Sequence, residues 1–240
     1  MTSLPALDSS GFQRVLCVVA HPDDMEYGAS AAVSRWTSAG IEVTYLLLTH
    51  GEAGMPQPPD EVAPVRTEEQ RRACAQVGVE DLRILDHPDG VLELTLGLRR
   101  DIARVIREVR PQVVMTSTWA DVAPWGINQA DHRVAGLSTA DAVAAAGNRW
   151  IFPELVEAEG LEPWSTTWLV VNGVQDPTHV IEVEESDVEA AVASLRQHEA
   201  YLAALPWHPK PEEFIPEILR DGGAAGGVDA GLPVRAHRVG

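Results

Sequence analysis

Apolar residues gather in short runs along the first half of the chain, and their spacing predicts alternating strands and helices. The run from Val15 to Ala20 is unbroken and of strand length, as expected for a strand covered on both faces. From Ala29 the apolar positions recur every three or four residues, and Gly40 stands where a helix would stop. With a second strand over 41–48, the pattern predicts a right-handed unit of two parallel strands joined by a helix.

The alternation continues to the middle of the chain. The capping-box pattern Thr67-x-x-Gln70 predicts a helix from Thr67 to Gly78, and a functional loop is expected over 51–64. The other elements expected in this part are a strand over 82–85, a helix over 98–109 and a strand over 112–117. We therefore expect an α/β fold, a Rossmann-like doubly wound and mostly parallel sheet flanked by helices.

The last third of the chain is less regular. Strands are expected over 168–171 and 179–183, and Ser186-x-x-Glu189 resembles a capping box for a helix that continues to Leu202. Glycines become frequent after Asp221, which predicts a loop or loose tail over 221–240, although Val234 could dock onto the body. We expect one domain over 1–240 that ends in this glycine-rich tail.

Charge narrows the range of partners. The 240 residues carry 36 acidic and 18 basic side chains, a net charge of −18 with histidines neutral. A chain this acidic, without an extended Lys/Arg cluster, is not expected to bind nucleic acid or an anionic membrane. The first 14 residues lack the features of a signal peptide, and no apolar run approaches the length of a membrane span. These features favour a cytoplasmic protein.

Chemistry is expected where the first strand ends, in the segment His21-Pro22-Asp23-Asp24-Met25-Glu26. Ligands of open parallel sheets bind beyond the carboxyl ends of the strands. There His21 offers an imidazole nitrogen, while one of the two adjacent carboxylates can bind a metal and the other can transfer a proton. The alternative is structural: a hydrogen-bonded histidine, and an Asp-Asp pair that caps the next helix.

A second histidine would favour the metal interpretation, and Asn128-Gln129-Ala130-Asp131-His132 supplies one at the start of an expected helix. If the strands ending near 20 and 117 are neighbours, His132 can meet His21 and Asp24. Two histidines, one aspartate and an open position form a catalytic zinc pattern. Asp131 could carry helix N-terminal charge or orient a ligand.

These motifs together resemble those of the PIG-L/LmbE-like zinc-dependent N-deacetylases. That family includes the N-acetylglucosaminyl-phosphatidylinositol deacetylases and the deacetylases and amidases of mycothiol and bacillithiol metabolism. The resemblance covers residues 14 to 205, and its further motifs fall in family order: the loop 49–54, Arg66, Asp89-Gly90 and the pair Asp131-His132.

The resemblance implies a role for each matching residue. It makes His21, Asp24 and His132 the ligands of zinc, with iron(II) as the alternative metal, and Asp23 the general base. It places Arg66, Glu52 and Asp89 near the substrate, although Arg66 could equally be a solvated charge beside a helix. Trp125, together with Trp119, could form an aromatic wall on which a sugar stacks.

One position departs from the family pattern. Many members have a histidine where this chain has Gln129, and that histidine acts as a general acid or stabilises the oxyanion. A glutamine amide can donate a hydrogen bond to negative charge but cannot pass on a proton. The acid role then falls to Asp23 alone, to another residue such as His179 or His87, or to none.

The main hypothesis is therefore a metal-dependent hydrolase that removes an acyl group, most simply acetyl, from a small soluble amino-sugar derivative. Two alternatives remain: an amidase of a thiol-sugar conjugate or natural-product intermediate, and a non-catalytic metal- or ligand-binding member. A Rossmann-type nucleotide binder is disfavoured because no G-x-G-x-x-G turn follows the first strand. Assembly into a homo-oligomer is left open.

Overall fold

The fold is built on a seven-stranded, mostly parallel sheet, described in a computed structural model that covers residues 3–240. The strand order is β3-β2-β1-β4-β7-β9-β8; β9 is antiparallel to both neighbours, and the pairs from β3 to β7 are parallel. The strands of this sheet are β1 (Arg14–Val19), β2 (Glu42–Leu47), β3 (Asp81–Ile84), β4 (Val113–Ser117), β7 (Trp168–Asn172), β8 (His179–Glu182) and β9 (Gly231–Arg238). The predicted Rossmann-like doubly wound α/β fold is confirmed.

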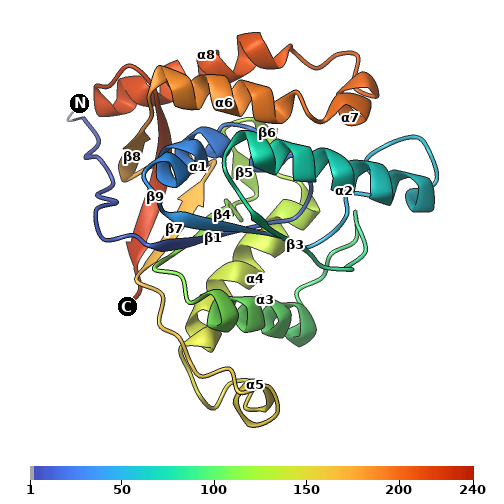
Figure 1. Cartoon of the computed structure of the whole chain (residues 1–240), viewed down its shortest axis with the longest axis vertical. Helices are drawn as coiled ribbons and strands as arrows, with labels where there is room; N and C mark the ends of the chain where they lie inside the picture. The colour runs from blue at the N-terminus through green and yellow to red at the C-terminus, as the bar shows by residue number, and fades with distance from the viewer. Residues whose placement is uncertain (1–2) are drawn as a thin grey trace.

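Helices cover both faces of the sheet (Figure 1). One face carries α1 and α2, with α6 packed against both of them, and α8, which packs against α6 and the strands β8 and β9; the other face carries α3 and α4. The helices are α1 (Ala29–Ser38), α2 (Pro59–Gln76), α3 (Leu96–Val109), α4 (Ala130–Ala146), α5 (Glu154–Glu157), α6 (Glu185–Leu195), α7 (Glu199–Ala203) and α8 (Pro211–Gly226). A small hairpin of β5 (Val122–Ala123) and β6 (Gly126–Ile127) precedes α4.

The strand β1 is the centre of the core because its alternate side chains feed both faces. Cys17 packs with the cluster that includes α1, whereas Leu16 and Val18 pack with the cluster that includes α3 and α4. This two-sided burial explains why the sequence of β1 is an unbroken apolar run rather than an alternating one.

The helix α4 lies unusually close to β4 because Gly136 has no side chain. A Cβ atom at this position would clash with the backbone oxygen of Ser117 and press on Trp119. His132 lies one helical turn before Gly136, so this close approach also fixes where that histidine stands at the end of β4.

The helix α2 begins earlier than the sequence predicted. It starts at Pro59, not at Thr67, so the loop expected over 51–64 ends at Pro58. Proline at the first helical position and acidic residues in the first turn favour this start. The Thr67 hydroxyl does not cap the helix; it lies 2.8 Å from His50 Nδ1.

The prediction of a loose tail over 221–240 is wrong. The segment forms the end of α8, a short turn and the strand β9, which bonds to both β7 and β8. Its glycines serve close packing: a Cβ on Gly222 would clash with Gly231 O, and one on Gly226 would clash with Val180. The sequence analysis interpreted these glycines as a sign of a flexible loop, whereas in the structure they allow neighbouring segments to pack closely.

The capping box expected at Ser186 and Glu189 is also wrong. Glu184 and Asp187 form it instead, each side chain accepting a hydrogen bond from the backbone of the other. The helix it begins stops at Leu195, and α7 restarts after His198.

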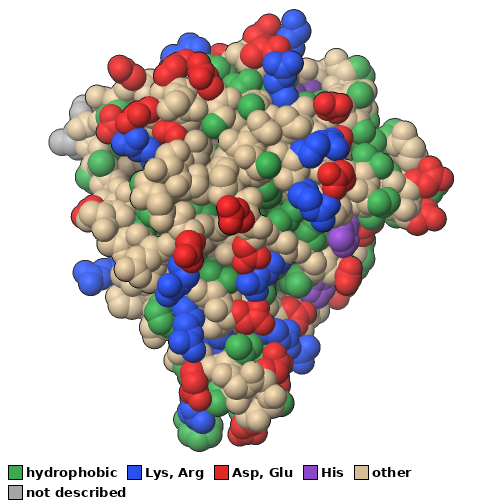
Figure 2. Space-filling view, in the orientation of Figure 1, with side chains coloured by type: hydrophobic (Ala, Val, Ile, Leu, Met, Phe, Trp, Pro, Cys, Tyr) green, Lys and Arg blue, Asp and Glu red, His purple; other side chains and the backbone are tan. Residues whose placement is uncertain are grey.

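On the face shown in Figure 2, Lys and Arg side chains are interspersed with Asp and Glu. Within residues 3–240, no helix is both long and apolar enough to cross a membrane.

Gly136→Ala is expected to destabilise the fold by about 1–3 kcal/mol, because α4 must move away from β4 to admit the methyl group. Gly97→Ala in α3 is the matched control. Its Cβ would meet only Thr95 Oγ1 at 3.7 Å, so the better helix propensity of alanine should leave stability unchanged or raise it. Urea denaturation measures both, and equal effects would contradict the packing argument.

Candidate metal centre

The candidate site lies where β1 and β4 end side by side. These strands are parallel neighbours, and the chain leaves them toward opposite faces of the sheet, to α1 and to α4. The turn after β1 carries His21, Asp23 and Asp24, and the first turn of α4 carries His132. The expected neighbourhood of the two motifs is therefore present.

Three side chains converge as a metal ion would require. His21, Asp24 and His132 each offer a donor atom, and these atoms all lie within 4.8 Å of one another. Asp24 Oδ1 is 3.0 Å from His132 Nε2, and Asp24 Oδ2 is 3.7 Å from His21 Nδ1. Ligands bound at about 2.1 Å to one tetrahedral ion lie about 3.4 Å apart, so these separations are compatible with a single metal ion bound by all three side chains.

The Asp24 carboxylate is held by the backbone that precedes it. Its Oδ2 accepts hydrogen bonds from the amides of Ala20, at 3.0 Å, and of His21, at 2.9 Å. These bonds leave Oδ1 directed at His132. One oxygen thus shapes the turn, and the other serves the cluster.

His21 is oriented from its far side by two more carboxylates. Its Nε2 lies 2.9 Å from Asp89 Oδ1 and 3.4 Å from Asp131 Oδ2. Asp131 also accepts from the amides of Gly90, at 2.7 Å, and of Leu92, at 3.1 Å, which fixes its position. With Nε2 occupied in this way, Nδ1 of His21 is the nitrogen available to a metal.

Glu52 and Asp89 clasp the two loops beside His21. Glu52 Oε1 accepts from the Asp89 amide at 2.9 Å, and Asp89 Oδ2 accepts from the Ala53 amide at 2.7 Å. Both were expected near the substrate. In the structure, Asp89 contacts His21 directly and Glu52 holds Asp89 in place, so both residues support His21.

The charges of the cluster favour a cation. Burial would lower the pKa of His21, but hydrogen bonds with Asp131 and its neighbouring carboxylates raise it to about 12. Burial would raise the pKa of Asp24, but the adjacent His132 holds it well below its usual range. The site thus pairs an ionised ligand with histidines that gain from positive charge, and a bound metal would replace protons there.

The pKa of Asp23 is shifted in the direction opposite to that of Asp24. Only 4% of it is exposed, and burial raises its pKa against the opposing effect of Arg66, whose Nη2 lies 3.1 Å from Asp23 Oδ2. Two neighbouring carboxylates with pKa values moved in opposite directions can divide the work of ligand and base. The Asp23 backbone has φ 90°, a left-handed conformation that is unfavourable for aspartate.

Arg66 is not the solvated charge that one interpretation of the sequence allowed. It is 2% exposed and donates to Gly51 O at 3.1 Å and to Pro22 O at 2.5 Å. A Cβ on Gly51 would collide with its guanidinium, so that glycine makes room for it. Its cationic face also stacks on Tyr201, with the ring centre at 3.9 Å.

The two histidines considered as general acid have hydrogen-bond partners elsewhere, and Gln129, which cannot pass on a proton, precedes α4. Gln129 is the exposed residue before α4, and its side chain makes no capping hydrogen bond. His87 Nε2 pairs with Asp101 at 3.3 Å, and His179 Nδ1 is 2.9 Å from Thr178 Oγ1. Over residues 3–240, neither histidine forms a hydrogen bond with the ligand cluster.

Trp125 stands at the turn of the β5–β6 hairpin and is 59% exposed. Its ring lies against Gly173, just beyond the carboxyl end of β7, where a Cβ atom would clash with it. Asn128 ties this hairpin to the start of α4 by donating to Thr118 O and Ala120 O. An exposed ring is therefore held at the edge of the sheet that carries the ligands.

Sequence reasoning missed the buried polar residues behind the site. Gln70, Glu26 and His198 are 1%, 0% and 0% exposed, although their residue types are usually found at the surface. Gln70 was interpreted as part of a capping box. Glu26 lies in the turn after β1, Gln70 in α2 and His198 between α6 and α7, so they share no local pattern that could have marked them.

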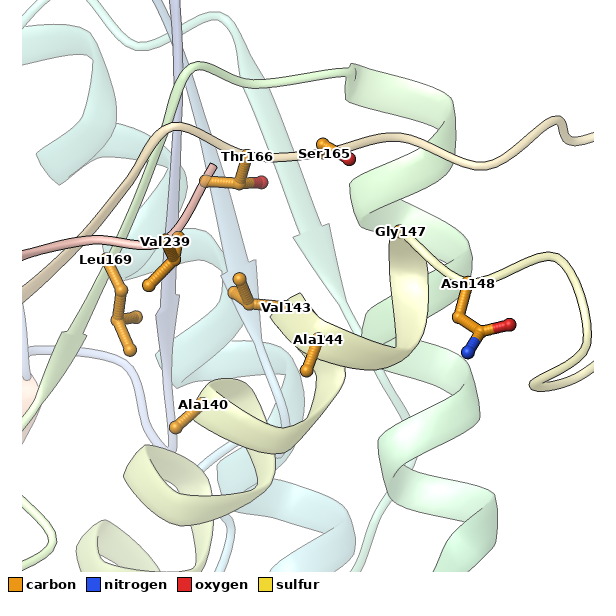
Figure 3. Close-up of a pocket in the computed structure, with 9 residues that line it drawn as sticks. All are labelled: Ala140, Val143, Ala144, Gly147, Asn148, Ser165, Thr166, Leu169 and Val239. Atoms are coloured by element: carbon orange, nitrogen blue, oxygen red, sulfur yellow. The ribbon is translucent and has the colours of Figure 1, made fainter.

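A pocket of about 310 Å³ lies at the other end of α4 (Figure 3). It is lined mainly by small and apolar side chains of α4, the segment before β7 and the chain end: Ala140, Val143, Ala144, Gly147, Asn148, Ser165, Thr166, Leu169 and Val239. Ala144 is 12 residues beyond His132, about 18 Å along the helix. This pocket is separate from the candidate centre.

Comparison with known proteins identifies a family to which this chain is similar. Residues 16–143 match the family model described as GlcNAc-PI de-N-acetylase, PIG-L. The chain is 32% identical to the diacetylchitobiose deacetylase of Thermococcus kodakarensis, over 81% of this chain and 72% of that protein. It is 31% identical to the 1D-myo-inositol 2-acetamido-2-deoxy-alpha-D-glucopyranoside deacetylase of Kineococcus radiotolerans, over 90% of this chain and 64% of that one.

A solved structure shares the fold. The N,N'-diacetylchitobiose deacetylase of Pyrococcus horikoshii superposes with a TM-score of 0.87 at 23% identity, covering 96% of this chain and 85% of that one.

His132→Ala is expected to weaken zinc binding by more than the roughly 100-fold that loss of an outer-shell partner costs, because it removes one of three donors. Competition with a chelator, followed by the zinc retained per chain, measures the change. His237→Ala, at an exposed histidine of β9, should bind zinc like the unaltered chain. Equal affinity of the two variants would exclude His132 as a ligand.

Proposed function

Because this chain belongs to the GlcNAc-PI de-N-acetylase (PIG-L) family, we propose that it hydrolyses an N-acyl amide, most simply N-acetyl, on a small amino-sugar derivative. The observation that carries the proposal is the pairing of a buried carboxylate, Asp23, with a three-donor cluster next to it in the chain. Amide hydrolysis needs a polarised carbonyl and a base for the attacking water, and these groups supply both.

The substrate class rests on the relatives. One is named for diacetylchitobiose and another for an inositol-linked 2-acetamido-2-deoxyglucoside, and both names describe a deacetylase. The shared unit is an N-acetylated glucosamine. We therefore propose this unit as the reacting part of the substrate, with thiol-sugar conjugates as one group of candidates for the remainder.

Zinc is the proposed metal. Two imidazoles and one carboxylate form a donor set that suits catalytic zinc, although the same set also suits iron(II). A divalent cation held by His21, Asp24 and His132 would polarise the amide carbonyl and lower the pKa of water at the open position.

Asp23 is the proposed general base. The raised pKa of its carboxyl group brings it closer to neutral pH, where a carboxylate accepts a proton most usefully. It would take the proton of the attacking water and deliver it to the leaving nitrogen. Arg66, 3.1 Å from Asp23 Oδ2, keeps enough of the carboxylate ionised for the first step and anchors the turn through Pro22 O.

Gln129 is the proposed donor to the developing oxyanion. It stands immediately before α4, three residues before His132, where its amide can turn toward a bound substrate. Because an amide cannot act as a proton donor in the acid–base sense, Asp23 carries both proton transfers in this scheme.

Trp125 is proposed as the platform for a sugar ring. Its exposed face and its position at the carboxyl edge of the sheet support this role, since the C–H faces of pyranoses stack on indole.

Asp23→Asn should reduce deacetylation of N-acetylglucosamine derivatives by at least about 100-fold, because the amide cannot accept the water proton. Zinc content should be unchanged, since Asp23 is not among the three donors. Release of acetate, with zinc per chain measured on the same sample, tests both statements.

An Asp23→Asn variant as fast as the unaltered chain would overturn the assignment of the base. Stoichiometric zinc without hydrolysis of any acylated amino sugar by the unaltered chain would instead favour a metal- or ligand-binding protein.

Trp125→Ala should raise KM for a glycosidic substrate about 3- to 10-fold with little change in kcat, because stacking stabilises ground state and transition state alike. Trp150→Ala is the matched control, since Trp150 is 79% exposed and lies beyond the C-terminal end of α4. Steady-state kinetics on the same substrate compare them, and a KM that rises equally in both would reject the platform.

A further inference from the structure

A chain of buried hydrogen bonds runs beneath Asp23 and ends in the helix layer behind the site. It starts at the Asp23 amide, which donates to Gln70 Oε1 at 2.9 Å. Gln70 Nε2 in turn donates to Glu26 Oε1 at 3.1 Å. Because Gln70 and Glu26 are 1% and 0% exposed, water does not compete for these bonds.

The orientation of the Gln70 amide is fixed from both ends. The Asp23 N–H can only donate, so it requires the oxygen of Gln70, and the Glu26 carboxylate accepts from the nitrogen. A flipped amide would face donor with donor at one end and acceptor with acceptor at the other. Gln70 is thus a rigid bracket between α2 and the turn after β1.

Glu26 is itself held in place. Its Oε1 is also 3.2 Å from Ser194 Oγ on α6, and its Oε2 is 3.8 Å from His198 Nε2. Ser194 and His198 are both 0% exposed. Two helices, α2 and α6, therefore meet the link before α7 and the turn after β1 at one sealed polar cluster.

The Asp23 backbone needs such a support. Its φ of 90° costs free energy for a residue with a Cβ, so the turn persists only if its surroundings hold it. The Asp23 amide contributes to that hold through Gln70, and the preceding carbonyl, Pro22 O, contributes through Arg66. Release of either contact would let the carboxylate swing away from the cluster.

We propose that Gln70, oriented by Glu26, is a positioning residue that holds Asp23 in its left-handed conformation and thereby aims the base at the substrate. The proposal rests on the proposed function for its effect on catalysis, but its effect on the Asp23 backbone does not depend on that function. Gln70 itself touches no ligand atom of the candidate centre and acts through Asp23.

An exchange of the two side-chain types tests this bracket. Gln70→Glu places two carboxylates face to face at the site of the present 3.1 Å bond. The double variant Gln70→Glu/Glu26→Gln restores one donor opposite one acceptor with the original net charge. Gln76→Glu, at an exposed position on the same helix, is the matched control.

The zinc-loaded Gln70→Glu variant should lose roughly 10- to 100-fold in kcat, as expected for a base displaced by about 1 Å. Its KM and zinc content should stay within about twofold, since substrate binding and the three donors are untouched. The double variant should recover roughly tenfold in kcat, because the two substitutions are coupled. The Gln76→Glu control should match the unaltered chain.

Amide hydrogen exchange of Asp23, resolved by NMR on the same zinc-loaded samples, gives a readout independent of activity. Exchange should be faster in Gln70→Glu and slow again in the double variant, whereas thermal unfolding separates a local effect from a global one. An Asp23 amide equally protected in Gln70→Glu, or a double variant as impaired as the single one, would overturn the proposal. If the unaltered chain hydrolyses no acylated amino sugar, the proposed function fails while exchange still decides the role of Gln70.

Discussion

The candidate centre depends on the way one carboxylate, that of Asp24, uses its two oxygens. Oδ2 closes the turn after β1 by accepting from the amides of Ala20 and His21, and Oδ1 faces His132. The same side chain therefore determines the shape of the turn after β1 and directs its second oxygen at the start of α4. Without the hydrogen bonds to Oδ2, the direction of Oδ1 toward His132 would not be fixed.

Two carboxyl groups next to each other in the chain, those of Asp23 and Asp24, have pKa values that are shifted in opposite directions. Asp24 lies next to histidines that lower its pKa, whereas Asp23, the next residue in the chain, is buried and has a raised pKa. The difference arises from the partners that the turn supplies: His132 and His21 together lower the pKa of Asp24, whereas for Asp23 the effect of burial outweighs the lowering effect of Arg66.

The sequence predicted the elements that carry a periodic apolar pattern. The unbroken run of β1 and the alternation from α1 to β4 sufficed for the parallel half of the sheet, and the meeting of His21 with His132 followed on the condition, met in the structure, that β1 and β4 are neighbours. Residues with two physical uses were not predictable in the same way. Gly222 and Gly226 permit close packing rather than a loop, and Gln70 supports Asp23 rather than beginning a helix. Which use applies is decided by partners far away in the chain, and a local pattern does not contain them.

Because β9, the last strand of the chain, lies between β7 and β8, the edge of the sheet that contains β8 can form only late in synthesis. The strand β8 bonds to β9 and, through one isolated bridge, to Ala6, so it has no place in the sheet until residues 231–238 have left the ribosome. The strands β1, β2, β3 and β4 pair with one another in the first half of the chain, and the candidate ligands follow two of them, β1 and β4. During synthesis, the strands β1 to β4 can therefore pair before the rest of the sheet is complete. The strand β8 stays unpaired in the sheet until β9 has been synthesised.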